Sequence, residues 1–308
     1  MSKILITGGA GFVGSYLSEY FKKDESNKVD RSSRTNGQGD IVLDLTNRDS
    51  VGDVLFNYDK IFHLAAQASV RNSFEDSFKT MRDNILSTLN LLELLKGKKI
   101  KLVIAGSSET YKWANSVLTE KSSLDAKSPF AISKLTIDYF VRTMAKPLDI
   151  NVTLLRLFSH IGPGQSEHFA LSNWAKQIAE IKLDRRTPTV KVGNIDIYRD
   201  YTDVRDVCYA YDLVSNCEEQ GEVYNVCSGT TYKLETLLHM LLEIAEVNAE
   251  IMIDKDRVRE IDAGFIRGSH KKIKERFGWM PKIPIEKSLR DLYNYWYGIL
   301  KSDVKRSG

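Results

Sequence analysis

The sequence predicts an α/β fold in which a doubly wound parallel sheet is followed by a smaller α/β lobe. Short β-branched runs alternate with longer helical patterns through the first half of the chain, which is typical of βαβ units. A glycine-rich turn joins the first of these runs to the first helix. The 308 residues, of which 42% are hydrophobic, suffice for a large core divided between two lobes.

The strand-like runs are short and apolar. We expect strands at residues 3–6, at a run ending near Asp30, and at residues 41–43, 60–64, 102–105 and 152–157. Helical patterns cover residues 15–23, 78–96 and 130–146. The last two helices are apolar on more than one face, so we expect the sheet to cover one side and something else, such as a second subunit, to cover the other.

Charge and composition exclude several classes of protein. The 44 basic and 41 acidic residues give a net charge of +3 and are scattered, which argues against nucleic acid or a membrane as the main partner. The three cysteines, Cys208, Cys217 and Cys227, form no C-x-x-C pair, which indicates buried thiols in a reducing cytoplasm rather than disulfides or a metal site. The longest apolar stretch is too short to span a bilayer, so we expect a soluble, unexported protein.

The glycine-rich turn is the clearest chemical motif. Residues 7–14 read T-G-G-A-G-F-V-G, between the first strand and the first helix. Glycines at Gly8, Gly11 and Gly14 allow a pyrophosphate to approach the backbone N–H groups at a helix N-terminus. In this position the motif predicts a Rossmann-type dinucleotide site, with residues 1–160 as the binding domain.

The second and third strands carry residues that would select the dinucleotide. At the end of the second strand, Asp30 can accept hydrogen bonds from the adenosine ribose and would repel a 2′-phosphate, whereas Arg31 and Arg34 would attract one. We therefore favour NAD(H), with NADP(H) as the alternative. Asp44 and Leu45 follow the third strand, where they could meet the adenine ring.

The ends of two further strands lie near the expected cofactor. Ala65 and Ala66 follow the fourth strand, where small residues let a cofactor pass close to the backbone. His63 beside them is interpreted as a packed strand residue rather than a catalyst. After the fifth strand come Ser107 and Glu109.

An active-site helix is indicated by residues 128–134, S-P-F-A-I-S-K. Phe130 and Lys134 are four residues apart and project from one helix face. With Tyr in the place of Phe130, the ammonium of Lys134 would lower the phenol pKa, and the phenol would exchange a proton with the substrate oxygen while Ser107 held that oxygen. Phe130 offers no such proton.

These residues together resemble the extended short-chain dehydrogenase/reductases. Later segments narrow the resemblance to the GDP-6-deoxy-4-keto-mannose reductases and, next, the GDP-mannose 4,6-dehydratases; they are residues 156–165, 175–178, 192–194, 198–206, 224–229 and 278–284. The resemblance covers nearly the whole chain. It makes residues 161–308 a nucleotide-sugar-binding lobe, interleaved with the first domain through parts of 195–228.

The resemblance implies a role for individual residues. The dinucleotide is expected to contact Gly8, Gly11, Phe12, Val13, Gly14, Asp30, Arg31, Asp44, Leu45, Ala65, Ala66 and Lys134. The catalytic positions are Ser107, Glu109, Phe130 (the Tyr position) and Lys134. The sugar nucleotide is expected to contact Ser69, Ser159, His160, Lys176, Val192, Asn194, Arg199, Arg259 and Asp262.

Within that set the resemblance distinguishes subsites. Arg199 and Arg259 match positions that clamp the diphosphate, where a guanidinium can bind oxygens bidentately. Residues 192–194 match the surroundings of the guanine, and Asp262 matches a position that holds the GDP ribose. Ser159 departs from the family, which usually has Asn there.

The resemblance implies hydride transfer between NAD(P) and C4 of a GDP-manno-configured hexose or heptose, as in the synthesis of bacterial surface-glycan sugars. A carboxylate such as Glu109 beside the sugar can also catalyse loss of water, so a 4,6-dehydratase is an alternative. A non-catalytic dinucleotide- or nucleotide-sugar-binding module is another. The two long helices resemble a four-helix subunit interface, which implies a homodimer or homotetramer.

Two explanations fit the missing phenol. Phe130 is either a deliberate replacement of Tyr that holds ligands without turnover, or a natural residue in an enzyme where another group, such as Tyr111, handles the proton. We favour the former, an impaired form of the enzyme, because Ser107, Glu109 and Lys134 are retained.

Overall fold

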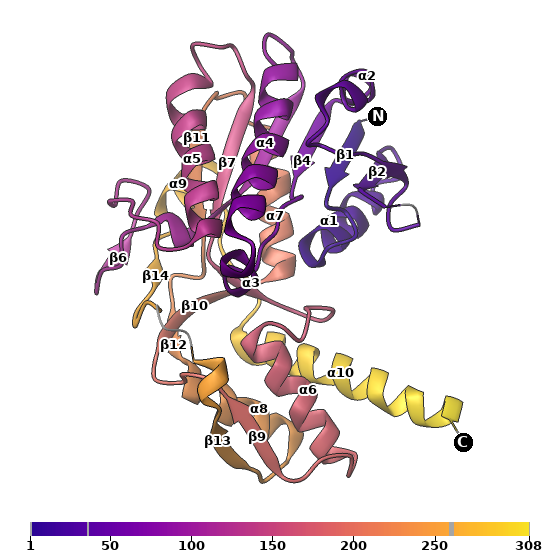
Figure 1. The fold of residues 1–308 in the computed structure, drawn as a ribbon, viewed down its shortest axis with the longest axis vertical. Coiled ribbons are helices and arrows are strands. Elements are labelled where there is room, and N and C mark those ends of the chain that lie inside the picture. Colours follow the sequence, from indigo (N-terminus) through magenta and orange to yellow (C-terminus); the bar gives the residue numbers. More distant parts are fainter. Residues whose placement is uncertain (1, 36, 259–261, 308) are drawn as a thin grey trace.

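The computed structural model describes residues 2–35, 37–258 and 262–307, with side chains through residue 302. Within these residues, seven parallel strands form the central sheet in the order β11-β7-β5-β4-β1-β2-β3. They are β1 (Lys3–Thr7), β2 (Lys28–Ser33), β3 (Ile41–Val42), β4 (Lys60–His63), β5 (Lys101–Ser107), β7 (Val152–Leu157) and β11 (Glu222–Val226). The doubly wound parallel sheet predicted from the sequence is therefore confirmed (Figure 1).

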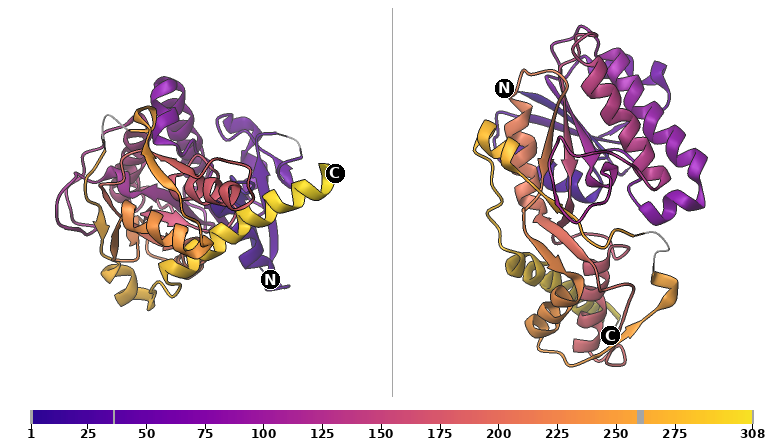
Figure 2. Two further views of the ribbon diagram at one scale, coloured as in Figure 1. Left: turned by 90° about the horizontal axis from the view of Figure 1, so that it is seen from below. Right: turned by 90° about the vertical axis from the view of Figure 1, so that its left-hand side faces the viewer.

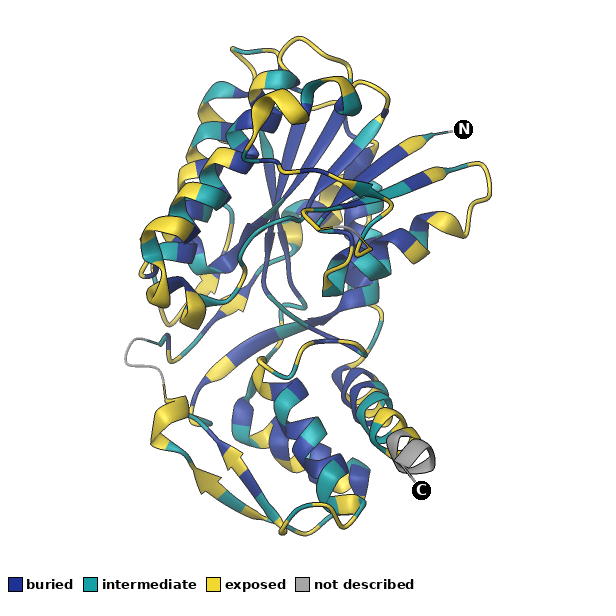
Figure 3. Ribbon diagram, turned by 45° about the vertical axis from the view of Figure 1, so that its right-hand side comes forward, coloured by how far each residue is buried: buried dark blue, intermediate teal, exposed yellow. Residues whose placement is uncertain are grey.

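Helices cover both faces of this sheet (Figure 2). One face packs against α2 (Gly52–Leu55), α4 (Ser77–Leu94) and α5 (Pro129–Met144). The other packs against α1 (Phe12–Lys22), α7 (Val204–Ser215) and α9 (Lys271–Phe277). The strands are buried on both sides (Figure 3), which explains why their sequences read as apolar runs rather than alternating ones.

A second hydrophobic core lies beyond the carboxyl edge of the sheet (Figure 1). It is built by α6 (Ala170–Lys182), α8 (Leu234–Ala245), α10 (Ile285–Ser307) and β9 (Thr189–Val192), which pairs with β13 (Glu250–Ile253). Between the two cores, β10 (Tyr198–Asp203) pairs with β8 (Ser159–Ile161) and β12 (Thr231–Lys233). The chain returns to the sheet with α7 and β11, so the second half of the sequence contributes to the first core.

The remaining short elements border the region between the cores. They are α3 (Val70–Glu75), β6 (Val117–Leu118) and β14 (Arg267–Gly268), which pairs with β6. No helix in the described part of the chain combines the length and the apolar character needed to cross a bilayer.

Local sequence signals set the helix ends. The Ser128 hydroxyl accepts a hydrogen bond from the Ala131 N–H at 3.1 Å, and Pro129 occupies the first turn, so α5 begins where these two residues predict. The first helix begins at Phe12, three residues earlier than expected, directly after the glycine turn. β2 continues to Ser33, so the expectation that it ends near Asp30 was wrong.

Candidate functional site

The glycine turn closes tightly against the loop that follows β4. Gly8 has φ of +69°, and a Cβ there would lie 2.8 Å from the backbone nitrogen of Ala65. A Cβ at Gly14 would lie 2.4 Å from the carbonyl oxygen of Gly8. No side chain caps α1 at Gly11, so its first-turn N–H groups are available to an anion. This cradle fits the pyrophosphate of a nicotinamide dinucleotide.

His63 lies directly behind this cradle. Its ring nitrogens form hydrogen bonds with the hydroxyls of Thr7 at 2.8 Å and Thr88 at 2.9 Å. The side chain is buried, and burial lowers the pKa of His63 to about 3. The interpretation of His63 as a packed strand residue is therefore confirmed. Thr88 comes from α4, a partner that the local sequence did not indicate.

Asp30 does not lie where the sequence suggested. It is opposite Leu5 on the face covered by α4 and α5, and its carboxylate accepts a hydrogen bond from the Tyr58 hydroxyl at 2.8 Å. Because side chains alternate along a strand, Arg31 lies on the opposite face. A Cβ on Gly9 would be 2.5 Å from the Arg31 Cβ, so Arg31 borders the glycine turn and Asp30 does not.

Both arginines of this segment have carboxylate neighbours. Arg31 forms an ion pair with Asp40 at 3.3 Å, and Arg31 lowers the pKa of Asp40 through hydrogen bonds. Arg34 lies 3.8 Å from Asp83.

The two residues expected to meet the adenine, which follow the third strand, differ in exposure. Asp44 is exposed, and hydrogen bonds from Thr46 lower its pKa. Leu45 is 5% exposed and packs in the core beneath α4, so little of its surface is available to an adenine ring.

The catalytic positions gather at the end of β5. Lys134 donates a hydrogen bond to the carbonyl oxygen of Ala105 at 2.7 Å, and burial lowers the pKa of Lys134 to about 8. The buried ring of Phe130 has its centroid 6.0 Å from this nitrogen. The Ser107 hydroxyl accepts a hydrogen bond from the Glu109 N–H at 3.1 Å. These positions are thus brought to one strand end.

Tyr111 is committed elsewhere. Its hydroxyl donates to Asn225 at 2.6 Å and accepts a hydrogen bond from Arg156 at 2.8 Å. Burial raises the pKa of Tyr111 to about 12. Because its hydroxyl is engaged by Asn225 and Arg156, Tyr111 is not available at the β5 end in place of the missing phenol.

Arg156 is the centre of a buried network that the sequence reading missed. It binds Asp138 of α5 through two hydrogen bonds of 2.7 and 2.8 Å, and neither side chain is exposed. The network fastens α5 to β7 and to the segment after Ser107. Two features of the sequence could have indicated this network. Arg156 is a charged residue in the otherwise apolar run V-T-L-L-R-L, and Asp138 is a carboxylate four residues after Lys134.

Arg199 and Asp262 lie together at the other side of the site. The Arg199 guanidinium donates a short hydrogen bond to the Asp262 carboxylate and a second, of 2.9 Å, to the carbonyl oxygen of Tyr198. Asp200 faces the other way and accepts hydrogen bonds from the backbone N–H groups of Ser228, Gly229 and Gly268.

The other predicted ligand residues are dispersed along the same region. His160 donates to the carbonyl oxygen of Phe158 at 3.1 Å and stacks on Phe12 with ring centroids 5.9 Å apart, and burial lowers its pKa. Val13 packs beside the core under α1. Ser159 pairs with Tyr201 in the strand ladder.

Three polar positions already have intramolecular partners. The Ser69 hydroxyl caps α3 by accepting from the Asn72 N–H at 3.2 Å. Lys176 donates to Glu167 at 2.5 Å, and Asn194 accepts from the Asp196 N–H at 2.9 Å. Val192 is fully buried in the second core, so its side chain is not available to a ligand. Arg259 lies outside the described residues.

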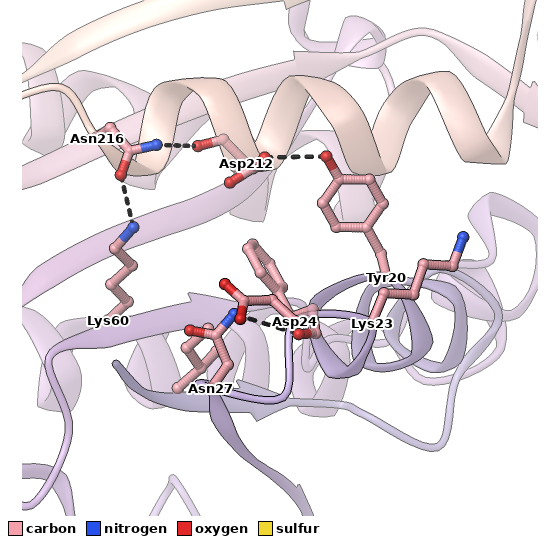
Figure 4. A pocket seen from close by; sticks show the side chains of 9 residues that line it. Tyr20, Lys23, Asp24, Asn27, Lys60, Asp212 and Asn216 are labelled. Atoms are coloured by element: carbon pink, nitrogen blue, oxygen red, sulfur yellow. Dashed lines mark hydrogen bonds between the residues drawn. The ribbon is translucent and has the colours of Figure 1, made fainter. Parts of the chain in front are cut away.

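A hollow of about 540 Å³ lies between α1 and α7 (Figure 4). Its lining includes Tyr20, which donates to Asp212 at 2.9 Å, and Lys60, which donates to Asn216 at 2.7 Å. Since Lys60 is the first residue of β4, the hollow lies at the amino edge of the sheet, opposite the glycine turn. Among the described residues no cluster of three or more His, Cys, Asp or Glu could hold a metal ion.

Comparison with known proteins gives matches along nearly the whole chain. A sequence model of the GDP-mannose 4,6 dehydratase family matches residues 5–292. The GDP-6-deoxy-D-mannose reductase of Pseudomonas aeruginosa is 34% identical over 300 residues, which cover 96% of this chain and 97% of that enzyme. The GDP-6-deoxy-D-talose 4-dehydrogenase of Aggregatibacter actinomycetemcomitans is 28% identical over 278 residues, 88% of this chain and 90% of that enzyme. The solved structure of RMD from Pseudomonas aeruginosa complexed with NADPH is 33% identical, with a TM-score of 0.85 over 97% of this chain and 100% of the other.

Proposed function

Because the chain belongs to the GDP-mannose 4,6 dehydratase family, we propose that it is a nicotinamide-dependent oxidoreductase acting at C4 of a GDP-sugar. The observation that carries the proposal is the convergence of Ser107 and Lys134 at the end of β5, on the same carboxyl edge of the sheet as the glycine turn. The two relatives are named for reactions of GDP-6-deoxy sugars, and this chemistry is the one we transfer here. We assign residues 1–160, with parts of 195–228, to the dinucleotide and residues 161–308 to the sugar nucleotide.

We assign each residue at the end of β5 a separate role in the reaction. A nicotinamide dinucleotide held at this site would supply or accept the hydride at C4 of the sugar. Ser107 donates a hydrogen bond to the oxygen at C4, and Lys134 contributes positive charge beside it. Phe130 faces Lys134 but has no proton to exchange, so we expect slow turnover with binding retained.

Replacing Phe130 with Tyr tests this proposal. Removal of a general acid–base group typically lowers the rate by about 10²- to 10⁴-fold, so Phe130→Tyr is expected to raise kcat by a similar factor. The measurement is the absorbance of the reduced nicotinamide with GDP-4-keto-6-deoxymannose and related GDP-sugars. Phe140→Tyr is the control. Phe140 lies on the part of α5 that packs against the core, so this change should leave kcat at the wild-type value. If Phe130→Tyr shows no faster turnover with any GDP-sugar, the proposal fails.

Phe130 also favours a second candidate function, a binding module without catalysis. Such a module would bind GDP-sugar and dinucleotide but stay inert with Phe130→Tyr. The dehydratase alternative depends on Glu109. It predicts release of water from GDP-mannose by the Tyr variant and its loss in Glu109→Gln, measured by mass spectrometry of the product.

For the cofactor we infer that NADP(H) is accepted. The sequence favoured NAD(H) because of Asp30. In the structure that carboxylate accepts a hydrogen bond from Tyr58 and lies away from the glycine turn. Arg31, whose stem lies against Gly9, can turn its guanidinium to a 2′-phosphate. The relative solved with NADPH supports the same choice.

We also infer a homodimer formed through α4 and α5. Large apolar side chains are exposed on these helices and on α3: Phe74, Phe78, Leu86, Ile132 and Tyr139, with Phe78 89% exposed. Such a patch is typical of a subunit interface. Phe78→Glu should give a monomer by sedimentation, whereas a wild-type monomer at micromolar concentration would contradict the inference. Three buried free cysteines fit a cytoplasmic location.

A further inference from the structure

The hollow between α1 and α7 contains a lysine that the proposed function does not use. Lys60, the first residue of β4, forms part of its wall (Figure 4). The Lys60 ammonium donates hydrogen bonds to the side-chain oxygen of Asn216 at 2.7 Å and to the hydroxyl of Ser215 at 3.0 Å. Both acceptors are uncharged, so neither of them neutralises the ammonium.

Several other lysines of the described chain are paired with carboxylates. Lys272 lies 2.6 Å from Glu222, and Lys287 lies 3.1 Å from Asp291. An opposite charge at such a distance stabilises the ammonium and keeps the nitrogen protonated. The neutral partners of Lys60 give it much less of this stabilisation.

The carboxylates closest to Lys60 have donors of their own. Asp212 accepts a hydrogen bond from the Tyr20 hydroxyl at 2.9 Å, and Asp59 accepts one from the backbone N–H of Lys3 at 2.7 Å. Burial lowers the pKa of Lys60, and the charges of Asp212 and Asp59 offset this effect only in part. A larger share of Lys60 is therefore neutral and nucleophilic than of an ordinary lysine.

Access distinguishes Lys60 from its neighbour Lys101. The two residues are partners in the register of β4 and β5, and burial lowers the pKa of Lys101 to about 8. Lys101 is only 4% exposed, and its ammonium donates to Asn151, Thr153 and the carbonyl oxygen of Cys217. Lys60 is less buried and borders a hollow of about 540 Å³, which has room for a small acyl group. Of the two amines, Lys60 is the one that a reagent can reach.

We propose that Lys60 is a modification site whose Nζ is acylated by small acyl donors, namely acyl phosphates or acyl thioesters. The neutral nitrogen attacks the acyl carbon, the bond from this carbon to the phosphate oxygen or thiol sulfur breaks, and the nitrogen releases a proton to water. The product is an uncharged amide that keeps one N–H to donate to Asn216. It is compatible with the nearby carboxylates of Asp212 and Asp59, which would repel an anionic modification.

This site is separate from the proposed oxidoreductase site. Lys60 lies at the amino edge of the sheet, whereas the glycine turn and the catalytic positions lie at the carboxyl edge. The hollow is on the face covered by α1 and α7, away from the exposed apolar side chains of α3, α4 and α5. The inference therefore does not depend on the proposed function.

Peptide mass spectrometry of the full chain after incubation with acetyl phosphate, and separately with acetyl-CoA, tests the proposal. Lys60 should be acetylated several times faster than the exposed Lys28, and Lys101 should stay unmodified. In the chain unfolded in guanidinium chloride, Lys60 and Lys28 should react at the same rate, because the difference between them comes from the fold. Reaction with either reagent supports the proposal and identifies the acyl donor.

Asn216→Asp keeps the size of the side chain and places a carboxylate beside the Lys60 ammonium. An adjacent opposite charge favours the protonated, unreactive form, so acetylation of Lys60 should slow about tenfold. Asn47→Asp adds the same charge at an exposed position away from the hollow and should leave the rate at its wild-type value. Lys28 should react at one rate in all three proteins.

Two results would overturn the proposal. One is that Lys60 of the folded wild-type chain is acetylated no faster than Lys28 by either reagent. The other is that Asn216→Asp slows acetylation of Lys60 no more than Asn47→Asp does.

Discussion

The two ends of the candidate site, the glycine turn and β10, differ in the groups that form them. At the glycine turn, backbone geometry and small residues form the cradle, and a Cβ on Gly8 or Gly14 would collide with neighbouring backbone atoms. At β10, charged side chains form the site, and the Arg199 guanidinium donates a hydrogen bond to the Asp262 carboxylate. The first end is therefore defined by the backbone, whereas the second is defined by the pairing of two side chains.

The largest expected effect separates a fully buried ion pair from one that borders solvent. Asp138→Asn leaves the buried guanidinium of Arg156 without its counter-charge and should lower the free energy of unfolding by about 3–5 kcal/mol. Asp262→Asn, at a pair whose side chains are 9% and 17% exposed, should lower it less, by about 1–3 kcal/mol. Urea unfolding of both variants measures the difference. Equal losses would show that the Arg199 pair is structural too.

Next in size is the effect of filling the cradle. A Cβ at Gly14 would lie 2.4 Å from a backbone oxygen, so Gly14→Ala must displace the turn. We expect about 100-fold weaker dinucleotide binding, within the usual range for overpacking, and unchanged GDP affinity. Gly298→Ala, where a Cβ meets nothing within 4 Å, is the control. Loss of GDP affinity in Gly14→Ala would mean that the two ends are not independent.

The acid stability of the dinucleotide end depends on His63. Its pKa is lowered to about 3 by burial, whereas an unfolded imidazole titrates near 6.5. Below pH 6.5 the unfolded state binds a proton that the folded state does not, so stability falls as the pH falls. From pH 7 to pH 5 this group should account for about 2 kcal/mol of lost unfolding free energy. In His63→Asn the unfolding free energy should therefore fall by about 2 kcal/mol less between pH 7 and pH 5 than in wild type. Replacing the exposed His239 with Asn should leave the fall at its wild-type size.

The smallest expected effect concerns the choice of dinucleotide. Arg31→Ala removes the guanidinium beside the glycine turn and should weaken NADPH binding about tenfold, with NADH affinity nearly unchanged. Fluorescence titration with both dinucleotides measures this. Arg48→Ala, at an exposed pair with Glu93, controls for net charge. Equal losses for NADH and NADPH would show that Arg31 supports the turn rather than a phosphate.

Much of the fold was predictable because its signals are local. The apolar runs predicted the strands, the glycine turn predicted the anion cradle, and Ser128 with Pro129 predicted the start of α5. The position of Lys134 beside Phe130 followed from helical spacing alone. The extra length of β2 was not predictable, since R-S-S carries no strong strand signal.

Local sequence patterns were enough to predict the sheet, the cradle and the chemical groups at the catalytic positions. Which polar groups are engaged by distant partners became visible in the folded chain. Tyr111 is committed to Asn225 and Arg156, Asp30 to Tyr58, and Arg199 to Asp262. The physical reason is that such pairings join residues far apart in the chain, and each depends on strand register, where a single residue reverses the direction of a side chain.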